Sequence, residues 1–187
     1  YAKDAYDIEY NFPFGWGEVE GVHNRTDFDL KQHENLSGKN MTYFDTKSQE
    51  KYHPYIIETS TGLNRLFLMV LCEAYFEDID NNRVVLRLPY ELAPIKAVIC
   101  PLVKKDGLPE KAMSLFNELN QAFPCVYDEQ GSIGKRYYRQ DEAGTPFGIT
   151  LDHDTLEDNS VTIRERDSMQ QTRIPINKIA TFISENK

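Results

Sequence analysis

The chain has 187 residues and a formal net charge of −9, from 21 basic and 30 acidic side chains. With 40% hydrophobic and 27% charged residues, its composition is typical of a soluble globular protein and excludes an intrinsically disordered one. The length suits one large domain or two small ones, and no apolar run approaches the ~18 residues that span a membrane. The acidic balance argues against a protein that coats nucleic acid through bulk charge.

The acidic side chains are concentrated in the first part of the chain. Residues 1–82 contain 7 basic and 15 acidic side chains, a net charge of −8, whereas residues 83–187 contain 14 and 15, a net charge of −1. The polar stretch 77–83 follows an apolar helical pattern and contains turn-favouring Asp and Asn residues. We therefore predict two domains, residues 1–82 and 83–187, joined by a linker at this stretch.

The N-terminal sequence carries no secretory signal, because it lacks a basic segment followed by an apolar one. It begins at Tyr1 without a methionine, which favours a start inside a longer protein. Three cysteines without a C-x-x-C pair indicate buried, reduced thiols. We therefore expect a cytoplasmic protein.

Two kinds of periodicity divide the first domain. Polar and apolar residues alternate over residues 7–12 and 18–23, which predicts half-buried strands. Residues 24–48 are polar and loop-like, with a short helix as the alternative near residues 29–33. A compact apolar strand is expected at residues 55–57. From Gly62 the period becomes helical and predicts an amphipathic helix. The apolar residues at this spacing are Leu63, Leu66, Phe67, Val70, Leu71, Ala74 and Tyr75.

The second domain alternates predicted strands and helices. Strands are expected at residues 97–103, 125–127, 147–151 and 161–166, and helices at residues 109–123, 133–142 and 177–184. Strands joined by crossover helices imply a mixed or parallel sheet that is covered on both faces. The pattern therefore predicts an α/β fold.

The segment ETSTGLNR, residues 58–65, combines chemically useful groups at a strand-to-helix junction. A carboxylate and hydroxyls end the strand, and Arg65 lies in the first helical turn, where unpaired backbone N–H groups favour an anion. An arginine fork at that place suits phosphate. A capped helix whose arginine pairs with a neighbouring acid is the alternative.

Two further clusters have a functional and a structural interpretation. Glu18 and Glu20 lie two apart on a predicted strand and so share one face, where they attract Mg²⁺ or an ammonium group or are simply solvated. Residues 132–144 combine Lys135, Arg136 and Arg139 with two tyrosines. This combination suits single-stranded RNA, and a solvated helix face is the alternative.

Taken together, these segments resemble a known family. FGWGEVEGVHNRTDFDL followed by IETSTGLNR resembles glycyl-tRNA synthetase of the class II, homodimeric type. The resemblance continues through LAPIKAVICPLVKK, SIGKRYYRQDEAGTP and VTIRERDSMQQ and covers essentially the whole chain. It implies the C-terminal part of an antiparallel-sheet catalytic domain, with the third class II motif, in residues 1–82. A mixed-sheet α/β anticodon-binding domain is implied in residues 83–187.

The resemblance also implies roles for individual residues. Arg65 and Glu58 are implied as catalytic, with Glu58 near a Mg²⁺ ion that arrives with ATP. The implied ATP-binding residues are Glu18, Val19, Gly62, Leu63, Asn64 and Arg65. The implied glycine-binding residues are Glu58, Thr59, Ser60, Thr61 and Gly62, although the family usually has Pro and Ala in place of the two threonines. Charge and motif position add Arg136, Arg139 and Arg166 as predicted anticodon contacts.

The implied activity is the ATP-dependent conversion of glycine to glycyl-adenylate and its transfer to the 3′ end of tRNA-Gly. The expected partners are ATP, Mg²⁺, glycine and tRNA-Gly, with a homodimer in the full-length protein and no membrane. The first two class II motifs would lie upstream of Tyr1, so we expect a C-terminal fragment that is inactive alone. A non-catalytic, synthetase-like accessory protein that binds tRNA or another nucleic acid is the alternative. The joint presence of Glu18, Glu58, Ser60 and Arg65 argues against it.

Overall fold

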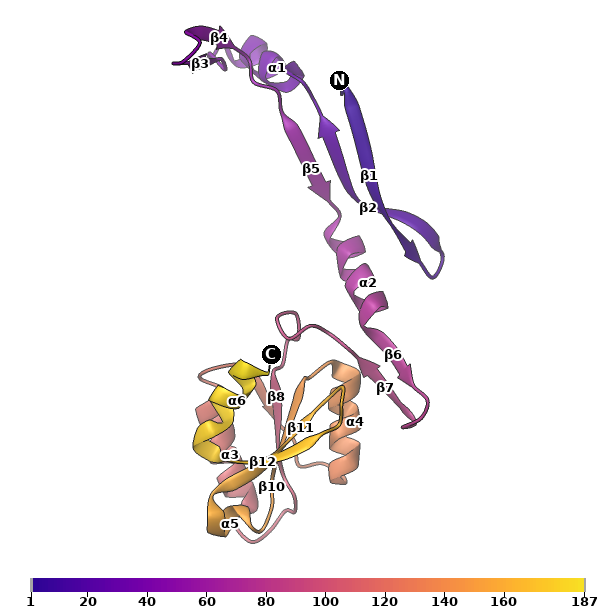
Figure 1. The fold of residues 1–187 in the computed structure, drawn as a ribbon, viewed down its shortest axis with the longest axis vertical. Helices are drawn as coiled ribbons and strands as arrows, with labels where there is room; N and C mark the ends of the chain where they lie inside the picture. The colour runs from indigo at the N-terminus through magenta and orange to yellow at the C-terminus, as the bar shows by residue number, and fades with distance from the viewer. Residues whose placement is uncertain (1, 187) are drawn as a thin grey trace. The chain divides into compact units, whose positions relative to one another are not determined.

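The computed structural model describes residues 2–186, which form two compact units divided between Cys72 and Glu73 (Figure 1). We call residues 2–72 the N-terminal unit and residues 73–186 the C-terminal unit. Both contain helices and strands, which confirms the predicted α/β class. None of the helices within residues 2–186 is both long and apolar enough to cross a membrane.

The N-terminal unit is built on a three-stranded antiparallel sheet with the strand order β1-β2-β5. Its strands are β1 (Asp4–Phe12), β2 (Gly15–Asn24) and β5 (Ile57–Thr61). Helix α1 (Phe28–Ser37) and the hairpin of β3 (Tyr43–Asp45) and β4 (Glu50–Tyr52) lie between β2 and β5 in the chain. These replace most of the loop predicted at residues 24–48. The predicted strand at residues 55–57 is displaced, because β5 is a mostly polar segment that pairs with β2 through its backbone.

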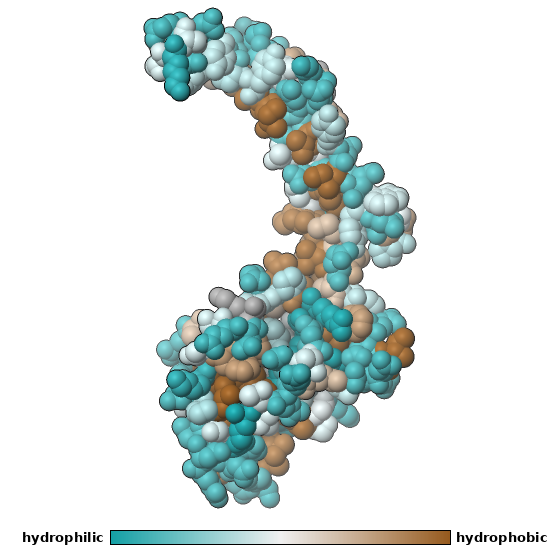
Figure 2. Space-filling view, in the orientation of Figure 1, coloured by the Kyte–Doolittle hydropathy of each residue, from teal (hydrophilic) through white to brown (hydrophobic). Residues whose placement is uncertain are grey.

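Helix α2 (Leu63–Ala74) confirms the helical periodicity that begins after Gly62. Its apolar residues are nevertheless largely exposed, with Leu63 at 77% and Phe67 at 62% of their full accessible surface. Figure 2 shows apolar residues gathered on the surface over β5 and α2. The spacing of apolar residues therefore predicted the helix, but not what covers it.

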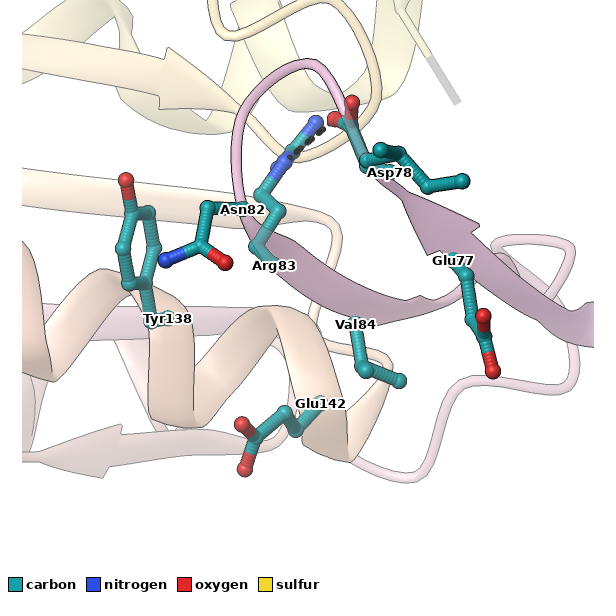
Figure 3. Close-up of a pocket in the computed structure, with 8 residues that line it drawn as sticks. Glu77, Asp78, Asn82, Arg83, Val84, Tyr138 and Glu142 are labelled. Carbon is teal, nitrogen blue, oxygen red and sulfur yellow. Dashed lines mark hydrogen bonds and ion pairs between the residues drawn. The ribbon is translucent and has the colours of Figure 1, made fainter.

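The polar stretch predicted as a linker is the turn of a hairpin. Strands β6 (Tyr75–Asp78) and β7 (Arg83–Leu86) pair antiparallel, and the side chain of Arg83 is only 1% exposed. Its Nε atom donates to Oδ2 of Asp78 over 2.7 Å, a contact drawn in Figure 3. Its Nη1 atom donates to Asp141 of helix α4 (Ile133–Ala143) over 2.7 Å. The hairpin is thus tied into the C-terminal unit, and the boundary predicted at residues 82/83 falls inside it.

The C-terminal unit contains a five-stranded mixed sheet with the strand order β12-β11-β10-β8-β9. Its strands are β8 (Ala97–Pro101), β9 (Cys125–Tyr127), β10 (Phe147–Leu151), β11 (Ser160–Glu165) and β12 (Gln171–Pro175). Strands β8, β9 and β10 are parallel, and β11 and β12 continue the sheet antiparallel. Four of the five strands were predicted, and β12 was not, because its polar and mostly exposed residues show no apolar alternation.

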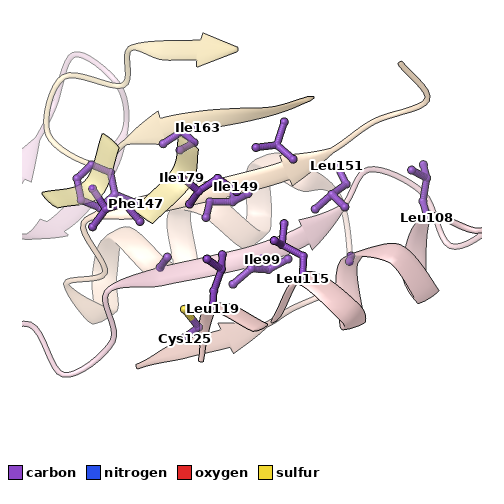
Figure 4. Packing of buried hydrophobic residues seen from close by; sticks show 14 residues of the cluster. Ile99, Leu108, Leu115, Leu119, Cys125, Phe147, Ile149, Leu151, Ile163 and Ile179 are labelled. Carbon is purple, nitrogen blue, oxygen red and sulfur yellow. The ribbon is translucent and has the colours of Figure 1, made fainter. Parts of the chain in front are cut away.

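Helices cover both faces of this sheet, as predicted. Helices α3 (Leu108–Leu119) and α6 (Ile179–Glu185) pack against one face, where Ile99 and Ile149 are fully buried (Figure 4). Helix α4 covers the other face, where the hydroxyl groups of Tyr137 and Thr150 are 2.5 Å apart. Gly148 makes this approach possible, because a Cβ atom there would lie 2.5 Å from the Tyr137 ring. The short helices α5 (Thr155–Asp158) and η1 (Ile176–Lys178) complete the unit.

Candidate functional site

The junction between β5 and α2 is the first part of the candidate site. Gly62 donates its backbone N–H to the carbonyl of Val19 over 3.4 Å, and its own carbonyl accepts the N–H of Leu66 over 2.9 Å. Helix α2 therefore begins directly beside β2. The N–H groups of a first helical turn have no partner within the helix, and with the helix dipole they favour an anion.

A β-bulge in β2 changes the direction of one acidic side chain. Ile8 lies opposite Glu20, and the next residue of β1, Glu9, lies opposite Glu18, which leaves Val19 as an extra residue. Because neighbours on β1 alternate between faces, Glu18 and Glu20 point to opposite faces of the sheet. The prediction that they share a face is therefore wrong, because the extra residue reverses the alternation.

The bulge brings Glu18 onto the face that carries Glu58 and Ser60, two of the predicted glycine-binding residues, whereas Thr59 and Thr61 point to the other face. Gly21 lies opposite Ser60 and His23 lies opposite Glu58, so all four share the face of Glu18. The side chains of His23 and Glu18 close over Gly21, because a Cβ atom there would lie 3.2 Å from the His23 ring and 3.5 Å from a Glu18 carboxylate oxygen. The result is an acidic surface that also carries a hydroxyl group.

The predicted ATP-binding residues line one hollow of about 420 Å³. Its lining residues are Glu18, Val19, Ser60, Thr61, Gly62, Leu63, Asn64 and Arg65. Nη1 of Arg65 donates to the backbone carbonyl of Glu18 over 2.7 Å, which fixes the side chain beside β2. The arginine is otherwise exposed and has no other hydrogen-bond partner among residues 2–186. Its remaining donors are therefore available to an anion.

Arg25 is a part of the site to which the sequence analysis assigned no role. Its Nη1 donates to Oε2 of Glu58 over 2.8 Å, and its Nη2 donates to Oδ1 of Asp29 over 2.8 Å. The hydrogen bond from Arg25 holds the pKa of Asp29 below its usual value. The polar run NRTDFD was a signal for this arrangement, but the pairing with Glu58, 33 residues away, depends on the β2–β5 register.

The predicted role of Glu58 near a Mg²⁺ ion that arrives with ATP stays a prediction. One of its carboxylate oxygens is bound to the cationic Arg25, which leaves one oxygen of this group for a further cation. Within residues 2–186, no group of three or more His, Cys, Asp or Glu side chains is arranged to hold a metal ion.

In the C-terminal unit, two of the three predicted anticodon contacts are buried. Arg136 is 3% exposed and Arg166 is 5% exposed. Arg136 donates to the carbonyls of Pro101 and Gly131, and Arg166 donates to the carbonyl of Gly144. Both guanidinium groups therefore serve the framework of the unit and are not presented to a base. Their contact with anticodon bases stays a prediction, which this burial does not favour.

Arg139 keeps an accessible side chain. It is 49% exposed, and its Nη2 donates to Oδ2 of Asp128 over 2.6 Å. Lys135 and Tyr138 on the same helix are also exposed. These three residues are the part of the predicted RNA-binding cluster that can meet a ligand.

A buried ionic network holds the opposite end of α4. Asp141 is 2% exposed and accepts hydrogen bonds from Arg83 of β7 and from both Nη atoms of Arg164 in β11. Its partners lie 58 and 23 residues away in the chain, so no local pattern indicated the network. Among the described residues no buried side-chain N or O atom lacks a hydrogen-bond partner, which agrees with a tightly specified unit.

Comparison with known proteins gives a consistent result. Residues 96–186 match the family model for the anticodon binding domain. The glycine–tRNA ligase of Treponema denticola is 54% identical over 199 aligned residues, which cover 100% of this chain and 44% of that protein. The ligase of Clostridium tetani is 55% identical over 99% of this chain, and the ligase of Chlorobaculum tepidum is 51% identical over 98% of it. In both cases the aligned part is 40% of the relative. The chain is similar in sequence to the C-terminal portion of glycine–tRNA ligases.

The homology to glycine–tRNA ligases extends over the whole chain but only part of the relatives. The chain matches a C-terminal portion of them and spans about two fifths of their length. Its C-terminal unit carries the anticodon-binding domain, whose match begins at residue 96, just before β8. The mixed sheet with helices on both faces is thus the fold of a class II synthetase anticodon-binding domain.

Proposed function

We propose that this chain supplies one side of a glycine–tRNA ligase active site together with the domain that reads the anticodon of tRNA-Gly. The observation that carries the proposal is the hollow at the β5–α2 junction, where Arg65 is held by the Glu18 carbonyl next to Ser60. The identity of 51–55% to ligases of this specificity supports it. A homodimer and a cytoplasmic location are proposed on the same grounds.

In the proposed activation step, a carboxylate oxygen of glycine attacks the α-phosphorus of ATP. A bond forms between that oxygen and phosphorus, the bond to the bridging oxygen breaks, and pyrophosphate leaves with its electron pair. Negative charge is spread over phosphate oxygens throughout. The exposed donors of Arg65 and the first-turn N–H groups of α2 lie ready at the hollow to bind these oxygens. Groups that are placed before the reaction lower its barrier electrostatically.

The face of Glu18, Gly21, Glu58 and Ser60 is proposed to bind the amino group of glycine. Carboxylate and hydroxyl oxygens accept hydrogen bonds from an ammonium group. Arg25 orients Glu58 through one oxygen and leaves its other oxygen for the substrate. A pocket fitted to glycine rejects a larger amino acid by steric collision, and no smaller amino acid competes.

In the proposed transfer step, a hydroxyl group of the terminal ribose of tRNA-Gly attacks the glycyl carbonyl and AMP leaves. The C-terminal unit is proposed to bind the anticodon through exposed groups that include Arg139, Lys135 and Tyr138. Cations bind phosphates, and an aromatic ring provides a surface on which an unpaired base stacks. The unit therefore needs no positive net charge to bind RNA locally.

Pyrophosphate exchange in a chimera tests the proposed active site. The chain replaces the corresponding portion of the Treponema denticola ligase, and glycine-dependent exchange between ATP and pyrophosphate is measured. We expect an active chimera in which Arg65→Ala lowers kcat by about 10²–10³-fold, as the loss of one preorganised donor does. The chain alone, which spans two fifths of the ligase, is expected to show no exchange.

Arg87→Ala is the matched control for Arg65→Ala. Arg87 is also an exposed arginine, but its guanidinium lies 3.3 Å from the centre of the Phe76 ring, outside the hollow. This variant is expected to retain the exchange rate. If the exchange rate of the Arg65→Ala chimera lies within threefold of that of its parent, the proposed role of the β5–α2 junction is contradicted.

A further inference from the structure

Arg136 joins the ends of two parallel strands in the C-terminal unit. Its Nη1 donates to the carbonyl of Pro101, the last residue of β8, over 2.6 Å. Its Nε and Nη2 donate to the carbonyl of Gly131, in the loop after β9, over 3.2 and 2.8 Å. The residue is 3% exposed. One buried cation thus links the end of β8, from which the loop at residues 102–107 begins, with the loop at residues 128–132.

These two loops lie where the sheet changes the direction of its connections. After β8 the chain continues into α3 on one face of the sheet, and after β9 it continues into α4 on the other. In open α/β sheets, ligands bind outside the carboxyl ends of the strands. The groups that the two loops expose there include Lys104, Lys105 and Gln130. The distance between the loops therefore decides which groups can reach a ligand together.

Further contacts hold the same loops. Nη2 of Arg139, one helical turn after Arg136, donates to Oδ2 of Asp128 and to the carbonyl of Gln130. Nζ of Lys104 lies 3.5 Å from Oε1 of Glu129 and so connects the loops at the surface. The side chains of Arg139, Lys104 and Glu129 are between 36% and 55% exposed, so water competes for these contacts. The buried Arg136 is therefore the most strongly constrained of these links.

The chemistry of arginine explains why this residue suits the position. Its planar fork offers donors in fixed directions, so a single group binds one carbonyl at the end of β8 and one in the loop after β9. A lysine at this place could bind one carbonyl strongly but could not hold both in a fixed geometry. Gly131 adopts φ = +77°, which turns the loop in a conformation that favours glycine.

We propose that Arg136 is a positioning residue for anticodon recognition: it sets the spacing of the loops at residues 102–107 and 128–132, so that their exposed groups contact neighbouring anticodon bases together. This inference rests on the proposed function, since it requires that the C-terminal unit reads the anticodon of tRNA-Gly. Arg136 itself touches no RNA. Its substitution therefore changes the discrimination between anticodons more than the general attraction to tRNA.

The test measures dissociation constants of the full chain for tRNA-Gly and for the same tRNA with one anticodon base replaced. The ratio of the two constants is the discrimination. For Arg136→Lys we expect this ratio to fall by about tenfold, while the affinity for the altered tRNA stays close to that of the parent chain. If Arg136→Lys does not fold, Arg136→Gln, which removes the charge and keeps a short donor, takes its place.

Asp141→Asn is the matched control for a purely structural effect. Asp141 is also a buried ionic residue of α4, but its partners are Arg83 and Arg164, which lie on strands and not on the two loops. Asp141→Asn is expected to lower the unfolding midpoint and to keep the anticodon discrimination. Hydrogen exchange gives a second readout, in which Arg136→Lys accelerates the exchange of the amides of the two loops and leaves those of β8 and β10 protected.

The outcomes separate this inference from the proposed function. A fall in discrimination for Arg136→Lys with no fall for Asp141→Asn supports the positioning role. Unchanged discrimination in folded Arg136→Lys overturns it. It is also overturned if Arg136→Lys and Asp141→Asn lose discrimination equally, in proportion to their loss of stability. A parent chain that binds both tRNAs equally overturns the proposed anticodon reading and this inference with it.

Discussion

The two units differ in how their side chains are packed. In the C-terminal unit, Ile99, Leu108, Ile149 and Ile179 are completely buried in one continuous core. Within residues 2–72, the only buried apolar side chains are those of Phe12 and Val19. The C-terminal unit is therefore specified by packing, whereas the N-terminal unit is specified mainly by strand pairing and polar contacts.

The proposed active site lies in the less densely packed unit. Its parts are a β-bulge at Val19, a strand-to-helix turn at Gly62 and an ionic bridge at Arg25. Each of these is a local backbone or polar feature that needs little apolar burial. The C-terminal unit instead uses buried arginines to fix its loops and helices. This contrast predicts that equivalent substitutions have unequal effects in the two units.

The largest difference is expected for ion pairs. Asp141→Ala leaves Arg83 and Arg164 buried without their shared carboxylate, and it should lower the free energy of unfolding of the C-terminal unit by about 3–5 kcal/mol. Asp27→Ala removes the exposed pair with Lys31 in the N-terminal unit and should leave the unfolding curve unchanged. Urea unfolding followed by circular dichroism measures both. Equal changes in the free energy of unfolding for the two variants would show that ion pairs contribute equally to the two units.

A similar contrast is expected for isoleucines. Ile99→Ala removes a completely buried side chain and should cost about 2–5 kcal/mol, because it leaves a cavity between β8 and α3. Ile57→Ala, in a residue of β5 that is 62% exposed, should have no measurable effect on unfolding. The same unfolding experiment tests the pair. A large loss of unfolding free energy for Ile57→Ala would mean that the side chain of Ile57 is covered in solution.

Sequence patterns predicted the two units unequally well for the same reason. In the C-terminal unit, apolar periodicity predicted β9 and β10 at their observed bounds, and α4 ends one residue beyond its predicted end, at Ala143. Burial of the same side chains that set the pattern explains this success. The pattern could not show the β6–β7 hairpin, because Arg83 is held there by an ion pair with Asp141 across 58 residues.

The candidate site shows the same limit. The motif at residues 58–65 located the strand-to-helix junction, and the residues predicted to bind ATP line one hollow there. The direction of Glu18 was missed, because a bulge depends on the register between β1 and β2 rather than on either sequence alone. The burial of Arg136 was missed because its partners are backbone carbonyls, which every residue type carries.

An effect of acid on stability is expected at the hairpin of the C-terminal unit. The hydrogen bond from Arg83 holds the pKa of Asp78 below its usual value. In the unfolded chain this carboxyl takes up its proton near pH 3.9, and in the folded chain it does so only at lower pH. Below about pH 4 the unfolded state therefore binds more protons, and stability falls as the pH falls through the folded pKa. Asp78→Asn should flatten this part of a plot of unfolding free energy against pH, and an unchanged slope would contradict the pairing.

The smallest effect is expected in the labelling of thiols. Burial raises the pKa of Cys100 and of Cys125 to about 12, whereas Cys72 of the N-terminal unit is only half-buried. A thiol reagent at pH 8 should therefore modify Cys72 in the folded chain and reach the other two only after unfolding. Mass spectrometry of labelled peptides over time measures each rate. If Cys100 is labelled as fast as Cys72, the packed sheet opens as readily as the N-terminal unit. The two units would then differ in packing but not in their dynamics.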